Sequence, residues 1–206
     1  MDNVDLALLL ALDCSASVTY EEFGLMAGGL AGALRDPAVI SGLIGGEFHA
    51  SLGALLLWSG SDAQELLVDW TRIASRDDAL GFADAVDNTP RVVRGGLTAI
   101  GQALIACLAV LDTQPARARR QVIDVAGDGS SNDGTPPGPV RDRLAAAGIT
   151  INGLCILHEE PDLLAYYTRE VIGGPGSFAM TCPDYPAFSE AMRQKLTREI
   201  ENRPVA

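Results

Sequence analysis

The sequence is poor in positive charge. Its 206 residues include 15 Lys and Arg against 27 Asp and Glu, which gives a net charge of −12, and Lys195 is the one lysine. Sequence-independent nucleic-acid binding depends on Lys and Arg side chains that neutralise phosphates, so we expect no nucleic-acid partner. The loop that binds nucleotide phosphates in many triphosphatases needs a lysine. With its single lysine at position 195, the sequence excludes that class of enzyme.

Long apolar runs are also missing. The longest near-continuous run, Leu6–Leu12, is far shorter than the roughly 20 residues that span a bilayer, so we expect no membrane span. Asp2 and Asp5 precede this run, where a signal peptide has basic residues. We therefore expect a cytoplasmic protein if Met1 is the native start, and a periplasmic or secreted one if a leader was trimmed.

Cysteine motifs are absent as well. Cys14, Cys107, Cys155 and Cys182 have no CxxC spacing, which argues against a zinc site built on them. Cys14 lies between residues expected to face the other way, so we expect it to be a small buried hydrophobe. Cys155 and Cys182 end two strands that look adjacent, and they could form a disulfide if the protein is exported.

The chain does contain alternating strand and helix patterns from end to end, and 48% of its residues are hydrophobic. This alternation predicts one domain over residues 1–206, an α/β fold with a doubly wound, mostly parallel sheet, one antiparallel edge strand and helices on both faces. The expected strands are Leu6–Leu12, Phe48–Trp58, Glu65–Trp70, Arg120–Ala126, Thr150–Leu157 and Ser177–Met180. The expected helices are Tyr20–Leu34, Ser75–Asp87, Ala99–Thr113, Val140–Ala147, Pro161–Val171 and Tyr185–Glu199. Trp58 and Trp70 are expected in the core or at a partly exposed edge.

Three loops at the expected carboxyl edge of the sheet carry the unusual polar content. Residues 13–17 read Asp-Cys-Ser-Ala-Ser, residues 95–98 read Gly-Gly-Leu-Thr, and residues 127–133 read Gly-Asp-Gly-Ser-Ser-Asn-Asp. Ligands of such sheets bind where the strands end at this edge. The three loops are therefore the place to look for a site.

These loops resemble the metal-ion-dependent adhesion site of von Willebrand factor type A (vWA) domains, whose pattern is DxSxS, then a Thr, then an Asp. The matching residues are Asp13, Ser15, Ser17, Thr98 and Asp128. A second resemblance lies in residues 166–176, Tyr-Tyr-Thr-Arg-Glu-Val-Ile-Gly-Gly-Pro-Gly. Together with the opening Asp-Cys-Ser, this segment is similar to a bacterial branch of vWA-like proteins, the domain of unknown function 1194.

The resemblance implies a divalent metal site, and the residue types fit one. Mg²⁺ prefers about six oxygen ligands and keeps several waters, which suits three hydroxyls and two carboxylates. The expected ion is Mg²⁺, with Mn²⁺ or Ca²⁺ as alternatives. The resemblance also implies that a protein partner offers an acidic residue as the last ligand.

Each residue also has an ordinary structural interpretation. Ser15 and Ser17 are plausible caps of the helix that begins near Tyr20, and Thr98 is a plausible N-cap of the next helix. Asp128 with Gly129 fits a simple turn. It is the joint occurrence of the three motifs, in order and at one sheet edge, that favours the metal site.

Other candidate residues carry weaker signals. Asp133 is expected to be a solvated loop residue. His158, Glu159 and Glu160 have ligand-type side chains but no second histidine at ligand spacing, so we do not expect a metal there. His49 is expected to have a structural role in a strand beside Phe48.

Three functions remain open from the sequence. The leading hypothesis is a non-enzymatic, metal-dependent protein-binding module. A metal-assisted hydrolase is the second, although no general base or nucleophile constellation accompanies the three loops. The third is a structural domain whose metal site does not function.

Overall fold

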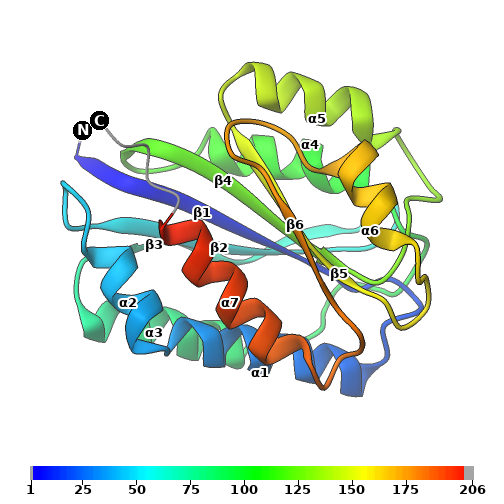
Figure 1. Ribbon diagram of the computed structural model, residues 1–206, viewed down its shortest axis with the longest axis horizontal. Coiled ribbons are helices and arrows are strands. Elements are labelled where there is room, and N and C mark those ends of the chain that lie inside the picture. Colours follow the sequence, from blue (N-terminus) through cyan, green and yellow to red (C-terminus); the bar gives the residue numbers. More distant parts are fainter. Residues whose placement is uncertain (1, 202–206) are drawn as a thin grey trace.

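The protein, described here from residue 2 to residue 201 by a computed structural model, is built on a six-stranded sheet (Figure 1). In sheet order, the strands are β3 (Gln64–Ile73), β2 (Ser51–Trp58), β1 (Asn3–Asp13), β4 (Arg117–Gly127), β5 (Thr150–Ile156) and β6 (Ala179–Cys182). Neighbouring strands are parallel except β2 and β3, which form an antiparallel hairpin at one edge. The expected sheet is confirmed. Residues 1 and 202–206 of the expected domain lie outside the described residues.

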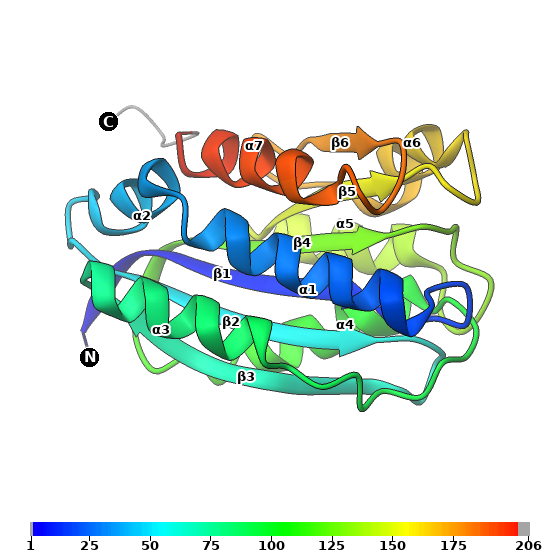
Figure 2. The same ribbon diagram turned by 90° about the horizontal axis from the view of Figure 1, so that it is seen from below.

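Helices cover both faces of the sheet (Figure 2). On one face lie α1 (Tyr20–Leu34), α2 (Pro37–Ile44), α3 (Arg76–Asp87) and α7 (Phe188–Glu201). On the other lie α4 (Ile100–Leu111), α5 (Pro137–Ala146) and α6 (Leu163–Tyr166), which continues into a π-helical turn, η1 (Tyr167–Val171). None of the described helices has the length and apolar character that crossing a bilayer requires.

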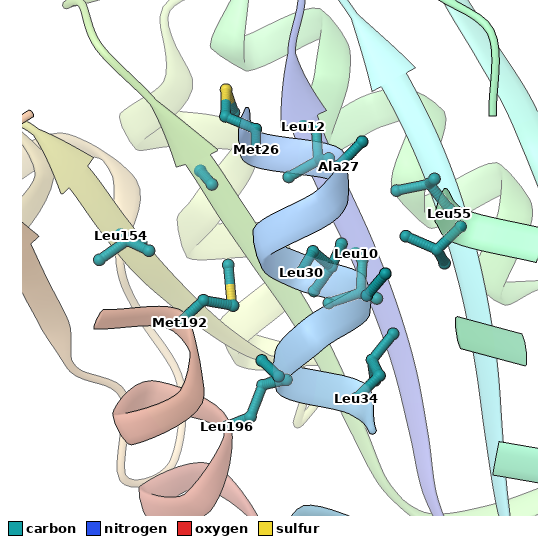
Figure 3. Close-up of a cluster of buried hydrophobic side chains, with 14 of the residues drawn as sticks. Leu10, Leu12, Met26, Ala27, Leu30, Leu34, Leu55, Leu154, Met192 and Leu196 are labelled. Carbon is teal, nitrogen blue, oxygen red and sulfur yellow. The ribbon is translucent and has the colours of Figure 1, made fainter. Parts of the chain in front are cut away.

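Strand β1 is the centre of the core because its side chains alternate between the two helix layers. Leu10 and Leu12 contribute to the cluster under α1, α3 and α7, whereas Leu9 contributes to the cluster under α4 and α5. Figure 3 shows Leu30 of α1 packed between the strands and α7. Because both faces of β1 are buried, its sequence is continuously apolar, as is usual for a central parallel strand.

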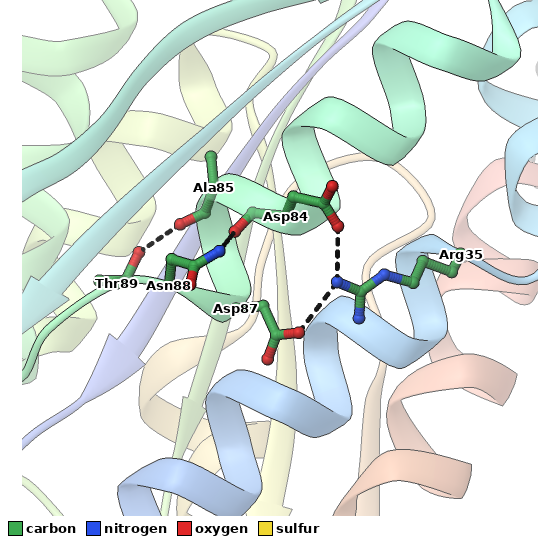
Figure 4. Close-up of polar contacts among 6 residues, drawn as sticks. All are labelled: Arg35, Asp84, Ala85, Asp87, Asn88 and Thr89. Carbon is green, nitrogen blue, oxygen red and sulfur yellow. Dashed lines mark hydrogen bonds and ion pairs between the residues drawn. The ribbon is translucent and has the colours of Figure 1, made fainter.

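An exposed ion pair joins α1 to α3. Arg35, the residue after α1, donates from one guanidinium nitrogen to Asp84 at 2.7 Å and to Asp87 at 2.9 Å (Figure 4). At the end of α3, the side-chain amide of Asn88 donates to the Asp84 carbonyl at 2.7 Å. These contacts close the last turn of α3 and hold it beside α1.

The sequence patterns misplace the segment before β2. The expected strand Phe48–Trp58 begins only at Ser51, and His49 lies in a loop with a positive φ of 51°. This loop is held by Asp5, whose carboxylate accepts from the backbone N–H groups of Glu47 and Phe48 at 2.8 and 3.0 Å. His49 is therefore not a strand residue.

Helix α2 is absent from the sequence-based expectations. Its start nevertheless carries a local signal, since Pro37 is its first residue and the Asp36 carboxylate accepts from the Ala38 N–H at 2.8 Å.

The expected helix Pro161–Val171 is in fact the short α6 followed by η1. The expected strand Ser177–Met180 is shifted, because the chain still turns at Gly174 and Gly176, both with positive φ, and pairs with β5 only from Ala179.

The cysteines are free and buried. Cys155 belongs to the cluster under α4 and α5, while Cys182 belongs to the cluster on the opposite face of the sheet. The register that places Cys182 opposite Ile156 is the reason, because neighbouring positions on a strand face opposite sides. The suggested Cys155–Cys182 disulfide is therefore wrong for this structure, whereas the expected burial of Cys14 is confirmed.

The order of the strands reverses at β1. The chain proceeds from β1 to β2 on one side of the sheet and later returns to β4 on the other side. The connection after β1 leads to α1 on one face, and the connection after β4 leads to α5 on the other (Figure 1). Loops that diverge in this way leave a crevice at the carboxyl ends of the strands, which is where open α/β sheets bind ligands.

Candidate metal site

The three polar loops meet at this crevice. Asp13 is the last residue of β1, and Asp128 directly follows β4, the strand paired with β1. The loop before α4 joins them because the Ala16 N–H donates to the Gly96 carbonyl at 2.9 Å. Three loops that are separate in the sequence, residues 13–17, 95–98 and 127–133, thus form one edge, as the sequence pattern predicts.

A chain of hydrogen bonds connects four of the five expected site residues. Asp13 Oδ1 accepts from the Ser15 N–H at 2.7 Å, and the hydroxyls of Ser15 and Ser17 lie 3.1 Å apart. The Ser17 hydroxyl donates to Asp128 Oδ1 at 2.9 Å. The hydroxyl of Tyr185, from the segment before α7, donates to Asp128 Oδ2 at 2.9 Å. The two carboxylates are thus linked through the backbone N–H and hydroxyl of Ser15 and the hydroxyl of Ser17.

Thr98, the fifth residue, is positioned through its backbone. Its N–H donates to Asn132 Oδ1 at 2.8 Å, and its carbonyl accepts from the Asn132 N–H at 2.9 Å. The Ser131 hydroxyl donates to the same carbonyl at 3.1 Å. A Cβ on Gly129 would lie 3.9 Å from Thr98 Oγ1, so the hydroxyl borders the loop that carries Asp128.

The electrostatics of the site are unfavourable without a cation. The Asp13 carboxyl is fully buried and Asp128 is 1% exposed. Burial raises the pKa of Asp13 to about 7, and the negative charge of Asp128 contributes to this shift. Two nearby carboxylates in a dry environment repel each other, which a divalent cation would relieve.

The residues present fit a hard divalent cation. Among the described residues, Asp13 Oδ2 has no hydrogen-bond partner although it is buried, and such an atom normally has one. The five matching side chains offer hydroxyl and carboxylate oxygens as metal ligands, which Mg²⁺, Mn²⁺ and Ca²⁺ prefer. Asp13, Ser15, Ser17, Thr98 and Asp128 therefore form a consistent set of oxygen donors.

The capping interpretation of the two serines is wrong. Helix α1 has Thr19 as its N-cap, with a capping box in which Thr19 Oγ1 accepts from the Glu22 N–H and the Glu22 carboxylate accepts from the Thr19 N–H. Ser15 and Ser17 lie before this cap and are not needed to begin the helix. Their side chains contact each other and Asp128 instead.

Thr98 does not cap α4 either. The N-cap position of α4 is Ala99, and no side chain of that residue makes a cap bond. The Ile100 N–H donates instead to the Ser131 hydroxyl at 3.2 Å. The Thr98 side chain is therefore not committed to the helix end.

The other candidate residues hold the loops in place through hydrogen bonds and a ring contact. The Asp133 carboxylate accepts from the Ser61 N–H at 2.8 Å, so it ties the loop after β4 to the β2–β3 hairpin, and this hydrogen bond lowers its pKa. Glu160 accepts from the N–H and the hydroxyl of Ser130. His158 packs edge-on against Tyr185, with ring centroids 6.2 Å apart. Over residues 2–201, no group of three or more His, Cys, Asp or Glu side chains is placed to hold a metal.

Three residues around the site were not anticipated. Arg91 donates to the carbonyls of Cys14 and Ser15 at 3.0 and 3.1 Å, and its guanidinium lies 4.8 Å from the ring centroid of Tyr20. Tyr185 and Asn132 are the others. Only Asn132, inside the third polar loop, had a local signal in the sequence.

The architecture and this edge define the protein as a vWA-type α/β fold, and solved structures agree. Proximal thread matrix protein 1 from the mussel byssus has a TM-score of 0.65 at 18% identity, over 96% of this chain and 46% of that chain. A von Willebrand factor type A protein from Catenulispora acidiphila has a TM-score of 0.64 at 18% identity, over 96% and 43%. The chain thus spans less than half the length of these relatives.

A neighbour of similar extent is the vWF domain of the type V pili tip protein Mfa5 from Porphyromonas gingivalis, with a TM-score of 0.64 at 9% identity, over 98% of this chain and 97% of that chain. Another structure of the mussel protein has zinc in its metal-ion-dependent adhesion site (MIDAS) motif. At these identities the likeness shows the fold alone.

The family itself is defined by sequence. A family model described as protein of unknown function (DUF1194) matches residues 3–204, so the chain belongs to this family. A comparison with curated proteins finds no match.

Proposed function

We propose that this protein is a non-enzymatic, metal-dependent protein-interaction module. In this proposal Asp13, Ser15, Ser17, Thr98 and Asp128 hold a divalent cation, with Mg²⁺ as the first choice and Mn²⁺ or Ca²⁺ as alternatives. The observation that carries the proposal is the fully buried Asp13 carboxylate, whose Oδ2 has no hydrogen-bond partner among the described residues and whose neighbour is a second buried carboxylate.

The ion would supply an electrophilic position for a carboxylate oxygen of a protein partner. The protein's own residues prepare this position. Arg91 fixes the backbone of the first loop, Asn132 fixes that of Thr98, and Tyr185 orients Asp128. Neighbours with a vWA fold are described as a pilus adhesin and a pilus tip protein, which supports an interaction role. We further propose that residues 1–206 form one domain, since all the described strands belong to one sheet and the described helices pack on its two faces.

The histidines support a non-enzymatic role. His49 precedes β2 and therefore lies at the sheet edge opposite the site, because β2 runs parallel to β1. His158 pairs with Glu159 at 3.6 Å and is half exposed. We propose that neither acts as a general base.

Calorimetric titration of Mg²⁺ into the wild type and the Asp13→Asn variant tests the site. We expect binding to the wild type and none to Asp13→Asn, because the amide cannot balance the charge of the ion. Asp133→Asn is the matched control, since Asp133 lies in the same loop as Asp128 but contacts Ser61. It should bind Mg²⁺ as the wild type does. Equal behaviour of Asp13→Asn and the wild type, with or without binding, would exclude the assigned site.

Thermal denaturation gives a second measurement on the same variants. A ligand present at 100 times its Kd stabilises the folded state by about 2.7 kcal/mol. For a chain of this size that is a rise in Tm of roughly 5–11 °C. We expect this rise in Mg²⁺ relative to EDTA for the wild type and Asp133→Asn, and its loss in Asp13→Asn.

A further inference from the structure

Tyr167 is a buried tyrosine whose ring packs in the core and whose hydroxyl bonds to no other described residue. It is the first residue of η1, its side chain is fully buried, and it contributes to the cluster under α4 and α5. Its ring packs so closely on β5 that a Cβ on Gly153 would lie 2.6 Å from Tyr167 Cδ1. Among the described residues the hydroxyl has no hydrogen-bond partner. A phenylalanine would fill this space without leaving a buried polar atom unpaired.

The hydroxyl faces the same small space as the unpartnered oxygen of Asp13. A Cβ built on Gly127 would lie 2.9 Å from Asp13 Oδ2 and 3.0 Å from Tyr167 OH. Two unpaired, buried oxygen atoms therefore flank one glycine at the end of β4. A larger residue at position 127 would fill the space between them.

We propose that Tyr167 is a positioning residue of the metal site, whose hydroxyl donates to Asp13 Oδ2 through one bridging water and so orients this carboxylate. The inference rests on the proposed function, because Asp13 is there a residue that holds the ion. Its new element is that η1, which lies outside the three polar loops, contributes to the site.

The chemistry of the pair suits this role. The phenol of Tyr167 carries its proton at neutral pH and can act as a hydrogen-bond donor. Asp13 Oδ1 already accepts from the Ser15 N–H. A donor on Oδ2 would hold the second oxygen and fix the plane of the carboxylate. Groups that orient metal ligands in this way typically change metal affinity 10–100-fold when they are removed.

The contact is tested in EDTA by a double-mutant cycle of Tyr167→Phe and Asp13→Asn, read as Tm. Side chains that interact give non-additive effects, whereas distant ones add. We expect the change in Tm caused by Tyr167→Phe to differ by roughly 1–12 °C between the wild-type and Asp13→Asn backgrounds. Tyr166→Phe is the matched control, because the neighbouring hydroxyl accepts from the Ser131 N–H at 3.2 Å. Its effect should add to that of Asp13→Asn.

The positioning role is tested by Mg²⁺ titration of Tyr167→Phe. We expect the affinity to fall about 10–100-fold while the Tm in EDTA confirms a folded protein. Additivity of the cycle within 1 °C overturns the inference, and so does an affinity within twofold of a wild type that binds Mg²⁺. A wild type that binds no Mg²⁺ overturns the proposed function and the role of Tyr167 in it. Because the cycle is measured without metal, it separates a failed contact from a failed metal site.

Discussion

Replacing Lys195 should destabilise the protein far more than replacing any surface cation. The Lys195 side chain is fully buried in α7, where its Nζ forms ion pairs with Asp124 of β4 and with Glu199 at 3.1 Å. Glu199 also accepts from the Asn152 amide at 3.1 Å, and the Lys195 Nζ lies 5.4 Å from the ring centroid of Phe178. The lysine thus pairs its single charge with two carboxylates that are at most 1% exposed.

The Lys195→Met substitution keeps the length of the side chain but removes its charge. Breaking a buried ion pair from one side costs about 3–5 kcal/mol, because the remaining charge is left in a dry environment. Here two carboxylates remain, so we expect the upper part of this range. For a chain of about 200 residues, each kcal/mol corresponds to roughly 2–4 °C in Tm. At about 4–5 kcal/mol, the expected loss is therefore roughly 8–20 °C.

The loss should grow with pH. Burial raises the pKa of Asp124 to about 7, while Lys195 counteracts this shift. A carboxyl whose pKa is higher in the folded than in the unfolded state makes the folded state bind the extra proton, so its contribution to stability falls as pH rises from about 4 to 7. Without Lys195 the folded pKa rises further, and the decline extends to higher pH. Lys195→Met should therefore differ less from the wild type at pH 5 than at pH 8.

Urea denaturation followed by circular dichroism at both pH values measures these free energies. Arg193→Met is the matched control, since Arg193 lies on the same helix but forms an exposed ion pair with Glu190. It should cost at most about 1 kcal/mol. The triple variant Lys195→Met, Asp124→Asn, Glu199→Gln should recover much of the lost stability because no charge remains in this cluster. A loss below 1 kcal/mol at pH 8, or one independent of pH, would refute the reasoning.

Three further changes can be followed by the same denaturation assay. Gly174→Ala should cost more than about 2 kcal/mol, because Gly174 has a φ of 88° and its Cβ would lie 2.1 Å from the Ile149 carbonyl oxygen. Gly24→Ala, at an open position inside α1, should instead stabilise by about 0.5–1 kcal/mol, and a loss there would contradict the helix-propensity argument. Leu30→Ala, in the fully buried core, should cost about 2–5 kcal/mol, and a loss below 1 kcal/mol would show that this part of the core repacks.

Local patterns in the sequence predicted those features that depend on local chemistry. The helix Tyr20–Leu34 has the expected bounds because its apolar spacing and the capping box of Thr19 and Glu22 are both local. The three polar loops meet at one edge because parallel strands end there. The loop that contains His49 was misplaced because Asp5, more than 40 residues away, holds it.

The sequence by itself determined the α/β class and the family, and it supplied the five residues of the proposed site, since periodicity and motif spacing are local properties of the chain. Only the tertiary structure decided what surrounds them. Tyr185 contacts Asp128 across 57 positions, and Tyr167 shares a space with Asp13 across an even longer separation. Tertiary packing also buries Lys195, a residue type that is usually exposed, between the carboxylates of Asp124 and Glu199. Such contacts follow from how distant segments pack, which no local pattern of residues specifies.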